Sequence, residues 1–552
     1  MRKRRLWAIF AALVIFAAAC GSSEGDGEAT ESAGSEATET DDGAGADESS
    51  PDDSDESAST GSEGDSAPAD GSMPDNIDRE ATLIWATSFV ANSLDVPSVS
   101  TDFAFTHVDP IYDTLVRRTP SGELVPSLAE SWEVTPEALT FTIVEGRTFH
   151  DDTPLDAEAV KANLDRIINC ECRFDVLLSA VSSVEASGNQ VTLNLSEPAG
   201  SLLQVLSDIP GMLASPASFG NEDIDTNPVG SGPFTVREYT DAGIFYDRWD
   251  GYHDAENTLV AAAEVRSIPD DNTRISGFIS GELDIGLARL GQLGEAEAGG
   301  LNVLRRAQAQ IYQLVVETDR GPLAEPDVRR AIGHALDREA INQGLYDGNC
   351  TPTVQPFPEG FPGYVADATV EKYGAYDVDL ARQLLADAGY PDGFEISMGA
   401  PAITNYTNQL EIYQAQLAEI GITVEAIPDE GRTFVDRLTA GEYDTWLGPN
   451  TTARPSSTNF WRAYYHPDGA RNSGGYELPG IDELLVNLES APSSEDQAAA
   501  LEALVVTSLD EAARSIIVCA PQTVTVHNDN IGGYEIPLAG NTTLRTVYKT
   551  TG

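Results

Sequence analysis

The sequence predicts an exported, two-lobed α/β protein, and three observations support this fold class. Residues 377–396 and 408–426 each combine an amphipathic helix, a glycine that can end it and an alternating strand. A helix followed by a strand, twice over, is typical of crossover units on a sheet. The chain beyond residue 78 is too long for one ordinary core, and a strand pattern at residues 515–527 follows a long helix, so we expect lobes joined by a hinge.

Residues 1–20 have the pattern of an export signal. A basic cluster at residues 2–5 precedes an apolar run at residues 6–19, which is shorter than the roughly 20 residues of a membrane-spanning helix. Small residues lead into Cys20 in a manner that resembles a bacterial lipobox, with Ala17 where Leu is usual. The resemblance implies that the signal is removed and that the Cys20 thiol carries lipid. An ordinary secretory cleavage is the alternative.

Residues 21–78 contain no aromatic residue, Lys or Arg and are rich in Gly, Ser, Ala, Thr, Asp and Glu. Such a composition cannot bury enough apolar surface to offset its ordering entropy, so we expect disorder. Repulsion between the carboxylates extends the segment, which suits a tether that holds a folded body away from an envelope surface. An acidic interaction tail is the alternative.

The chain is strongly acidic, with a formal net charge of -58 at pH 7. The body remains acidic when the signal and the tether are set aside. We therefore expect no nucleic-acid partner, because phosphate binding needs the opposite sign of charge.

Four cysteines follow Cys20, namely Cys170, Cys172, Cys350 and Cys519. An even number in an exported chain predicts two disulfides, for which three connectivities are possible. We favour Cys170 with Cys172 and Cys350 with Cys519. The alternative is a zinc site, for which one Cys-x-Cys without a second close pair or a nearby His is weak evidence. We expect neither a metal nor a cofactor.

Capping residues and periodicity predict the other elements. Asp156 is a good N-cap for a helix at residues 156–167, and Pro326 stands near the start of a helix at residues 325–345. Asp377 caps the helix that opens the stretch of residues 377–396, and Gly389 can end this helix in the left-handed conformation. The alternating or apolar runs at residues 81–90, 138–146 and 190–195 predict strands, residues 119–122 predict a turn, and residues 495–513 predict a last long helix.

Six stretches carry a family resemblance. They are LVPSLAESWEV with LTFTIVEGRTFHDDTPLDAEAVKANLDRI (124–134 and 139–167), NPVGSGPFTV (227–236), ISGELDI (279–285), PDVRRAIGHALDREAI (326–341), YDVDLARQLLADAGYPDGFEI (376–396) and LAEIGITVE (417–425). In this order they resemble the family 5 extracellular solute-binding proteins, the peptide, nickel and oligosaccharide receptors of ABC importers. Asp152, Ser231 and Phe234 depart from the family pattern.

This resemblance implies a periplasmic-binding-protein-like fold (type II, cluster C-like), in which two α/β lobes flank a cleft and close on a hinge around a ligand. An extra domain is inserted near the N-terminus, and the C-terminus returns to the first lobe. The implied division is a signal at residues 1–20, a tether at 21–78, lobe I at 79–115 with 220–305 and 515–552, an inserted domain at 116–219 and lobe II at 306–514.

The resemblance also implies a position for the ligand. In peptide-binding members, an Asp in a Gly-Trp-x-x-Asp-x-x-Asp-Pro-like loop pairs with the α-ammonium of the peptide. In the matching stretch, residues 442–467, Gly448-Pro449 stands where Gly-Trp is usual and Arg454 takes about the place of the carboxylate. A guanidinium binds a carboxylate, phosphate or sulfate, so we expect an anionic ligand, or a neutral one held by aromatic residues. The alternative for Arg454 is an internal ion pair or exposure to solvent.

Other candidate ligand contacts lie at strand ends or carry aromatic rings. Ligands of α/β folds gather beyond the ends of strands, and aromatic rings can form stacking walls, although such rings are more often part of a core. His107 is expected to be structural. The full set of predicted ligand-binding residues is Ser88, Phe89, Asn92, Asn405, Tyr406, Trp446, Gly448, Asn450, Arg454 and Trp461.

The predicted function is that of a substrate-binding lipoprotein of an ABC importer, not an enzyme. It would be a monomer, lipid-anchored at the extracytoplasmic face of the cell envelope, with a small-molecule or peptide ligand and an ABC permease and ATPase as partners. An envelope sensory or chaperone lipoprotein on the same fold is the first alternative. A hydrolase is the second, but Gly-x-Ser-x-Gly at residues 21–25 lies in the tether and lacks the strand-turn-helix context of a nucleophile.

Overall fold

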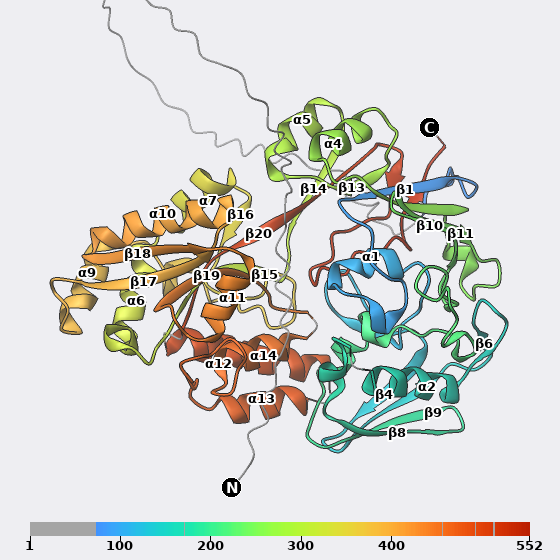
Figure 1. Cartoon of the computed structure of the whole chain (residues 1–552), viewed down its shortest axis with the longest axis horizontal. Coiled ribbons are helices and arrows are strands. Elements are labelled where there is room, and N and C mark those ends of the chain that lie inside the picture. Colours follow the sequence, from blue (N-terminus) through green and yellow to red (C-terminus); the bar gives the residue numbers. More distant parts are fainter. Residues whose placement is uncertain (1–72, 171, 455, 492, 512–513, 552) are drawn as a thin grey trace, which may run out of the picture. The chain divides into compact units, whose positions relative to one another are not determined.

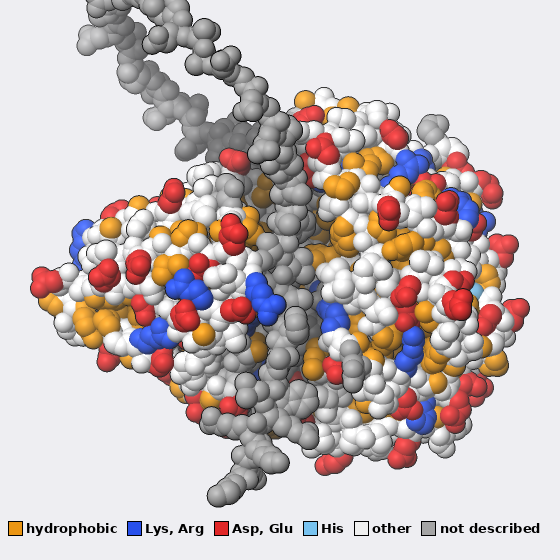
Figure 2. Space-filling model, in the orientation of Figure 1, with side chains coloured by type: hydrophobic (Ala, Val, Ile, Leu, Met, Phe, Trp, Pro, Cys, Tyr) orange, Lys and Arg blue, Asp and Glu red, His pale blue; other side chains and the backbone are white. Residues whose placement is uncertain are grey.

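A computed structural model describes residues 73–170, 172–454, 456–491, 493–511 and 514–551. They belong to one compact unit, residues 67–552. The predicted signal, Cys20 and most of the predicted tether lie outside the described residues. Among the described helices, none is both long and apolar enough to cross a bilayer. Figure 2 shows Asp and Glu side chains spread over the visible face, with fewer Lys and Arg.

The largest sheet has twelve strands in the order β10-β11-β12-β1-β13-β20-β15-β19-β17-β18, with β14 and β16 also paired to β20. Its strands are β1 (Thr82–Thr87), β10 (Phe234–Thr240), β11 (Gly243–Arg248), β12 (Ala262–Ser267), β13 (Ile285–Leu287), β14 (Asn302–Ala307), β15 (Gln310–Val316), β16 (Cys350–Pro352), β17 (Phe394–Pro401), β18 (Ile422–Asp429), β19 (Thr445–Thr451) and β20 (Ser515–His527).

Strand β20 pairs with two different groups of strands. Its first half pairs with β15, from Ser515 opposite Val315 to Cys519 opposite Tyr312. Its second half pairs with β14, from Gln522 opposite Ala307 to His527, and with β13. Because β14 and β15 follow each other directly, two antiparallel segments connect the strand groups of β1 and of β19 (Figure 1). A strand that returns to the first part of the chain was the expectation for this segment.

Helices cover both faces of the β15-β19-β17-β18 group. One face packs on α10 (Thr404–Glu419), whose Leu410, Tyr413 and Leu417 share a buried cluster with Leu314 and Met398. The other helices in this part of the chain are α6 (Pro326–Ala335), α7 (Arg338–Tyr346), α8 (Val370–Tyr373), α9 (Val378–Asp387), α11 (Gly431–Thr439), α12 (Ser457–Tyr465), α13 (Ile481–Glu489) and α14 (Ser494–Asp510).

The predicted cap of α9 and the helix start near Pro326 are confirmed, but the predicted length of the second helix is corrected. Asp377 accepts a hydrogen bond from the Leu380 backbone N–H, and Gly389 follows the helix with φ of 94°. The helix predicted over residues 325–345 is two helices, because Asp337 caps the second one by accepting from Ala340 N and Leu336 is extended between them.

A second, four-stranded antiparallel sheet has the order β4-β5-β9-β8 and packs on α2 (Ala157–Ile168), which Asp156 caps as predicted. Its strands are β4 (Ala129–Val134), β5 (Ala138–Ile143), β8 (Val181–Ser187) and β9 (Gln190–Leu195). The remaining elements are α1 (Phe105–Val108), α3 (Leu202–Val205), α4 (Asp271–Ile279), α5 (Leu293–Ala298) and the short strand pairs β2 (Val116–Arg118) with β3 (Leu124–Pro126), β6 (Arg147–Thr148) with β7 (Pro154–Leu155), and β21 (Ile531–Gly532) with β22 (Tyr548–Lys549).

Two disulfides are present, and they are the favoured pairs Cys170 with Cys172 and Cys350 with Cys519. The second joins β16 to β20, where Pro352 stands opposite Cys519. This covalent link therefore lies near the middle of β20, next to the point where its pairing changes from β15 to β14.

Candidate functional site

The directions of the strands define where a ligand would be expected. Strands β13 and β15 both run antiparallel to β20. Strand β1 is parallel to β13, so it runs against β20, whereas β19 is antiparallel to β15 and so runs with β20. Strands β17 and β18 follow the direction of β19. The carboxyl ends of the β1 group and of the β19 group therefore point toward each other along the middle of β20, and ligands of α/β folds bind beyond such ends.

The predicted residues after β1 make contacts mainly within their own loop. The Phe89 carbonyl accepts from Thr87 Oγ1 at 2.7 Å and lies 3.1 Å from His107 Nε2, and the Phe89 and His107 rings are 5.0 Å apart. Asn92 is exposed and binds the Ser98 carbonyl and the Ser100 backbone N–H. Ser88 is half-buried. His107 is fully buried, and desolvation lowers its pKa to about 4, which fits the structural role predicted for it.

Asn405 and Tyr406 lie in the first turn of α10, just after β17. Asn405 Nδ2 donates to the Tyr312 hydroxyl at 3.4 Å, and the Tyr406 ring stands edge-on to the Tyr312 ring at 6.1 Å. Tyr312 in turn stacks on Tyr346 at 5.3 Å. Burial raises the pKa of all three tyrosines, so their hydroxyls are neutral hydrogen-bonding groups. Sequence reasoning did not identify Tyr312 and Tyr346, because neither residue lies within one of the six family stretches.

Trp446, Gly448, Asn450 and Trp461 come together between the sheet and α12. The first three alternate along β19 and so share one face of the sheet. On α12, Ser457, Trp461 and Tyr464 share a face by helical spacing. The Trp446 and Tyr464 rings are 6.0 Å apart and nearly parallel, which places these two faces against each other. Both tryptophans are buried, with 3% and 0% of their surface exposed, so they pack in this layer.

This layer holds buried polar atoms that lack a partner. Among the described residues, Asn450 Nδ2, Ser457 Oγ and Trp461 Nε1 are buried and make no hydrogen bond. Leaving such a group unpaired costs roughly 1–3 kcal/mol, so native proteins usually satisfy it with protein, water or ligand. All three atoms can donate, which favours an oxygen-bearing acceptor as their partner.

Arg454 makes an internal ion pair. Its Nε and Nη2 atoms donate to the two carboxylate oxygens of Asp208, each at 2.8 Å, and the two side chains are 6% and 3% exposed. The arrangement is the alternative that we considered for this residue. A ligand anion would have to compete with Asp208, so the predicted contact of Arg454 with a ligand stays a prediction that this geometry does not favour.

Arg118 lies beside this ion pair and was not predicted. Its Nη1 donates to the Ala453 carbonyl at 3.2 Å and its Nη2 to the Gln204 carbonyl at 3.0 Å. Its Nε is buried and has no partner among the described residues. Desolvation and the nearby Arg454 lower its pKa to about 10, against the opposing effect of Asp208. The sequence offers little to single out Arg118, which is the later of two adjacent arginines directly before the turn at residues 119–122.

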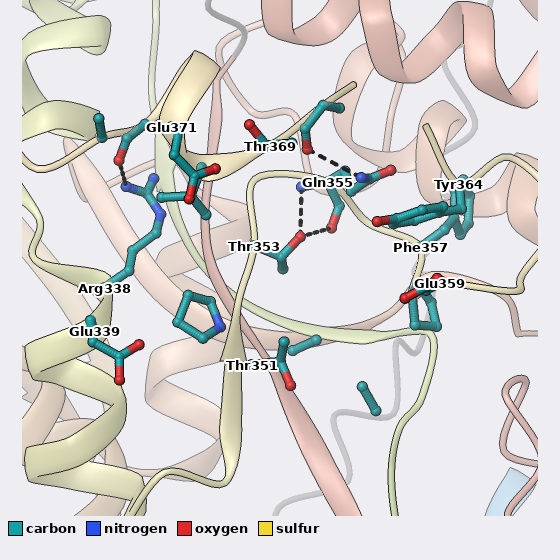
Figure 3. A pocket seen from close by; sticks show the side chains of 18 of the residues that line it. Arg338, Glu339, Thr351, Thr353, Gln355, Phe357, Glu359, Tyr364, Thr369 and Glu371 are labelled. Carbon is teal, nitrogen blue, oxygen red and sulfur yellow. Dashed lines mark hydrogen bonds between the residues drawn. The ribbon is translucent and has the colours of Figure 1, made fainter. Parts of the chain in front are cut away.

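A separate cavity of about 740 Å³ lies beside β16 and β20 (Figure 3). None of the predicted ligand-binding residues lines it. Arg338 is one of its buried residues, but its guanidinium donates to the backbone carbonyls of Ile517, Gly333 and Gly374. Gln355 is likewise bound to the backbone of Val365 and Ala368. These hydrogen bonds tie both side chains to the backbone around the cavity.

The described residues contain no group of three or more His, Cys, Asp and Glu side chains arranged to hold a metal ion.

Comparisons with known proteins agree on one family. The sequence model of the bacterial extracellular solute-binding proteins, family 5 (middle), matches residues 123–472. The glutathione-binding protein GsiB of Pectobacterium atrosepticum is 25% identical over 443 residues, which cover 76% of this chain and 84% of that protein.

Solved structures agree on the fold. HbpA2 from Haemophilus parasuis superposes with a TM-score of 0.78 at 22% identity, covering 85% of this chain and 100% of the other. The unliganded periplasmic murein tripeptide-binding protein MppA gives a TM-score of 0.78 at 17% identity, covering 87% and 99%. The chain thus has the mixed α/β, two-lobed fold of periplasmic binding proteins.

Proposed function

Because the chain belongs to the bacterial extracellular solute-binding proteins of family 5, we propose that it captures a small organic solute between its two strand groups and delivers it to an ABC permease. Members of the family are extracytoplasmic solute-binding proteins of ABC importers and not enzymes. The finer parts of the proposal are the solute class, the lipid anchor on Cys20 and the monomeric state.

The main observation behind the proposal is that the strands of the two groups point their carboxyl ends toward each other. The carboxyl ends of β1 and of β17 and β19 point toward each other along β20. Residues that follow these ends therefore face each other from the two strand groups, and a rotation about the two connecting segments would bring them together or separate them. The unpaired donors of Asn450, Ser457 and Trp461 lie in β19 and α12 of the same region.

The relatives support an organic solute that carries oxygen acceptors. The related GsiB is named for glutathione. A dipeptide-binding protein from a Pseudoalteromonas species, whose fold is similar, has been solved in complex with Met-Leu. Both compounds carry carboxylate and amide oxygens, which suit the unpaired donors. We therefore propose a carboxylate-bearing or amide-rich solute of about this size.

A thermal-shift screen tests the proposal. The full chain with Cys20→Ser, which prevents lipidation, is melted alone and with glutathione, dipeptides, N-blocked peptides, oligosaccharides and nickel chelates. Binding to the folded state alone raises the melting temperature by mass action, by an amount that grows with ligand concentration. A saturable rise with a peptide-like or other organic acid supports the proposal. A panel without any saturable shift contradicts it and favours a sensory or chaperone lipoprotein.

A fractionation experiment tests the lipid anchor. The unaltered chain is expected in the membrane fraction of its host and the Cys20→Ser variant in the soluble extracytoplasmic fraction, because one acyl-bearing residue is the proposed attachment. Equal distribution of the two forms contradicts the anchor without affecting the solute-binding proposal.

A further inference from the structure

The guanidinium of Arg118 reaches between two distant segments of the chain. Arg118 ends β2. Its guanidinium donates to the Gln204 carbonyl in the segment that contains Asp208, and to the Ala453 carbonyl in the segment that contains Arg454. The same two segments are joined by the Arg454–Asp208 ion pair and by the bond from Ser457 N to Gln204 Oε1 at 2.8 Å. Arg118 is thus held in place from both sides by backbone carbonyls.

The charges in this cluster do not balance among the described residues. Arg118 and Arg454 are two cations, and Asp208 is the one described carboxylate that acts on Arg118. Asp208 already accepts two hydrogen bonds from Arg454 and one from the Ile209 backbone N–H. Arg118 therefore has no carboxylate bonded to it, although desolvating a cation is costly unless an anion compensates it.

Buried polar groups without a partner occur at Arg118 and in the chain next to Arg454. Within the described part of the chain, Arg118 Nε is buried without a partner, and so are both amide atoms of Asn541, a residue that is 8% exposed. The residue before Asn541 is Gly540. A Cβ atom placed on Gly540 would lie 3.8 Å from Arg454 Cδ, so the backbone passes close to Arg454 here. The Phe105 ring, 5.9 Å from Arg454 Cζ, borders the cluster on its apolar side. The Arg118 Nε–H and the Asn541 Nδ2 group are donors suited to a carboxylate, which accepts several hydrogen bonds.

From these observations we propose that Arg118, and not Arg454, binds an anionic oxygen group of the solute, most directly a carboxylate, and that the Asp208–Arg454 pair positions it. The inference rests on the proposed function for the identity of the ligand as a solute. It makes Arg118 the residue that selects acids over neutral analogues.

Acetate is the probe for the first test, because it carries the carboxylate and little else. The melting temperature of the Cys20→Ser chain is measured while acetate replaces chloride at constant ionic strength. We expect a saturable rise that Arg118→Gln abolishes. Arg432→Gln is the matched control, because it removes the same charge from a side chain that is 82% exposed, and it should keep the rise. A response that is the same with and without Arg118, including no response in either, overturns the proposal.

Asp208→Asn supplies a test that does not depend on the folding of the Arg118 variant. Removing the carboxylate leaves two cations without compensation, so the acetate-induced rise should become larger, and its midpoint should move to lower acetate concentration. A purely structural role of the cluster would destabilise the variant without strengthening its response to acetate. An unchanged or weaker response overturns the proposal.

The two proposals fail separately. Solutes that bind in the screen while acetate acts independently of Arg118 would remove Arg118 from recognition and leave the receptor function in place. An acetate response that depends on Arg118, in a chain that binds none of the screened solutes, would keep the anion site and remove the proposed function.

Discussion

At the scale of single residues, the charged groups proposed to act in recognition have partners far away in the sequence. Arg454 could be singled out because it replaces a carboxylate in a known loop pattern, but its partner Asp208 is 246 positions away and belongs to no motif. An arginine that is committed to an internal carboxylate looks the same in the sequence as one offered to a ligand. The sequence therefore pointed to Arg454, and only the fold shows that Arg454 is held in an ion pair and that Arg118 Nε has no partner among the described residues.

His107 gives a prediction at this scale. Burial lowers its folded pKa from 6.5 to about 4, so the folded state prefers the neutral ring. Its contribution to the free energy of unfolding is fully present above pH 6.5 and is lost as the pH falls through about 4. The whole contribution amounts to about 3 kcal/mol.

Chemical denaturation at a series of pH values checks this expectation. The free energy of unfolding of the His107→Gln variant should change less between pH 6.5 and pH 4 than that of the unaltered chain. His466→Gln is the control, because its ring pairs with Asp482, a side chain that is 80% exposed. Parallel pH profiles for the His107 variant and the unaltered chain would show that the ring is accessible to protons in the folded state.

At the scale of elements, the sequence predicted the features that depend on neighbouring residues, such as helix caps, and missed those that depend on distant residues. The caps of α2 and α9 and the glycine that follows α9 could be read directly, because a cap is satisfied within a few residues. The break between α6 and α7 was missed, since Asp337 can be read as a polar residue of one helix or as the cap of the next. The division of β20 between two partner strands has no local signal, because pairing depends on residues some 200 positions away.

The two disulfides give a prediction at the scale of elements. The chain-entropy model ties the effect of a disulfide to the length of the loop it closes. The Cys350–Cys519 link closes a loop of sequence separation 169, whereas Cys170–Cys172 has a separation of 2. Replacing the first pair by alanine should lower the free energy of unfolding by about 5 kcal/mol, and replacing the second by about 1–2 kcal/mol.

Guanidinium unfolding of the two double variants measures both losses. The Cys170→Ala/Cys172→Ala chain serves as the control for the loss of a disulfide as such. Equal losses in the two variants would mean that the unfolded chain is already held together near Cys350 and Cys519 by residual structure.

At the scale of the whole molecule, the acidic charge sets the electrostatic conditions. The strongly acidic body works against its own compact state through self-repulsion, and salt screens this repulsion beyond about 10 Å at 0.1 M and about 3 Å at 1 M. Buried pairs such as Arg454–Asp208 are screened less than exposed charges.

We therefore expect the melting temperature to rise by several degrees as sodium chloride increases from 0.1 M to 1 M, because self-repulsion weakens faster than the buried ion pairs. Differential scanning calorimetry at constant pH measures the shift. A melting temperature that falls with salt would show that the exposed ion pairs outweigh the repulsion.

The sharing of β20 has a consequence for the order of assembly. Neither strand group can complete its part of the twelve-stranded sheet until β20, which begins at Ser515, is available, and among the described strands β14 and β16 pair with β20 alone. Pairings across such sequence distances are slow to form. A chain that is threaded through a membrane from its N-terminus would consequently stay open for most of its passage, and the two halves would become native together as the final strand arrives.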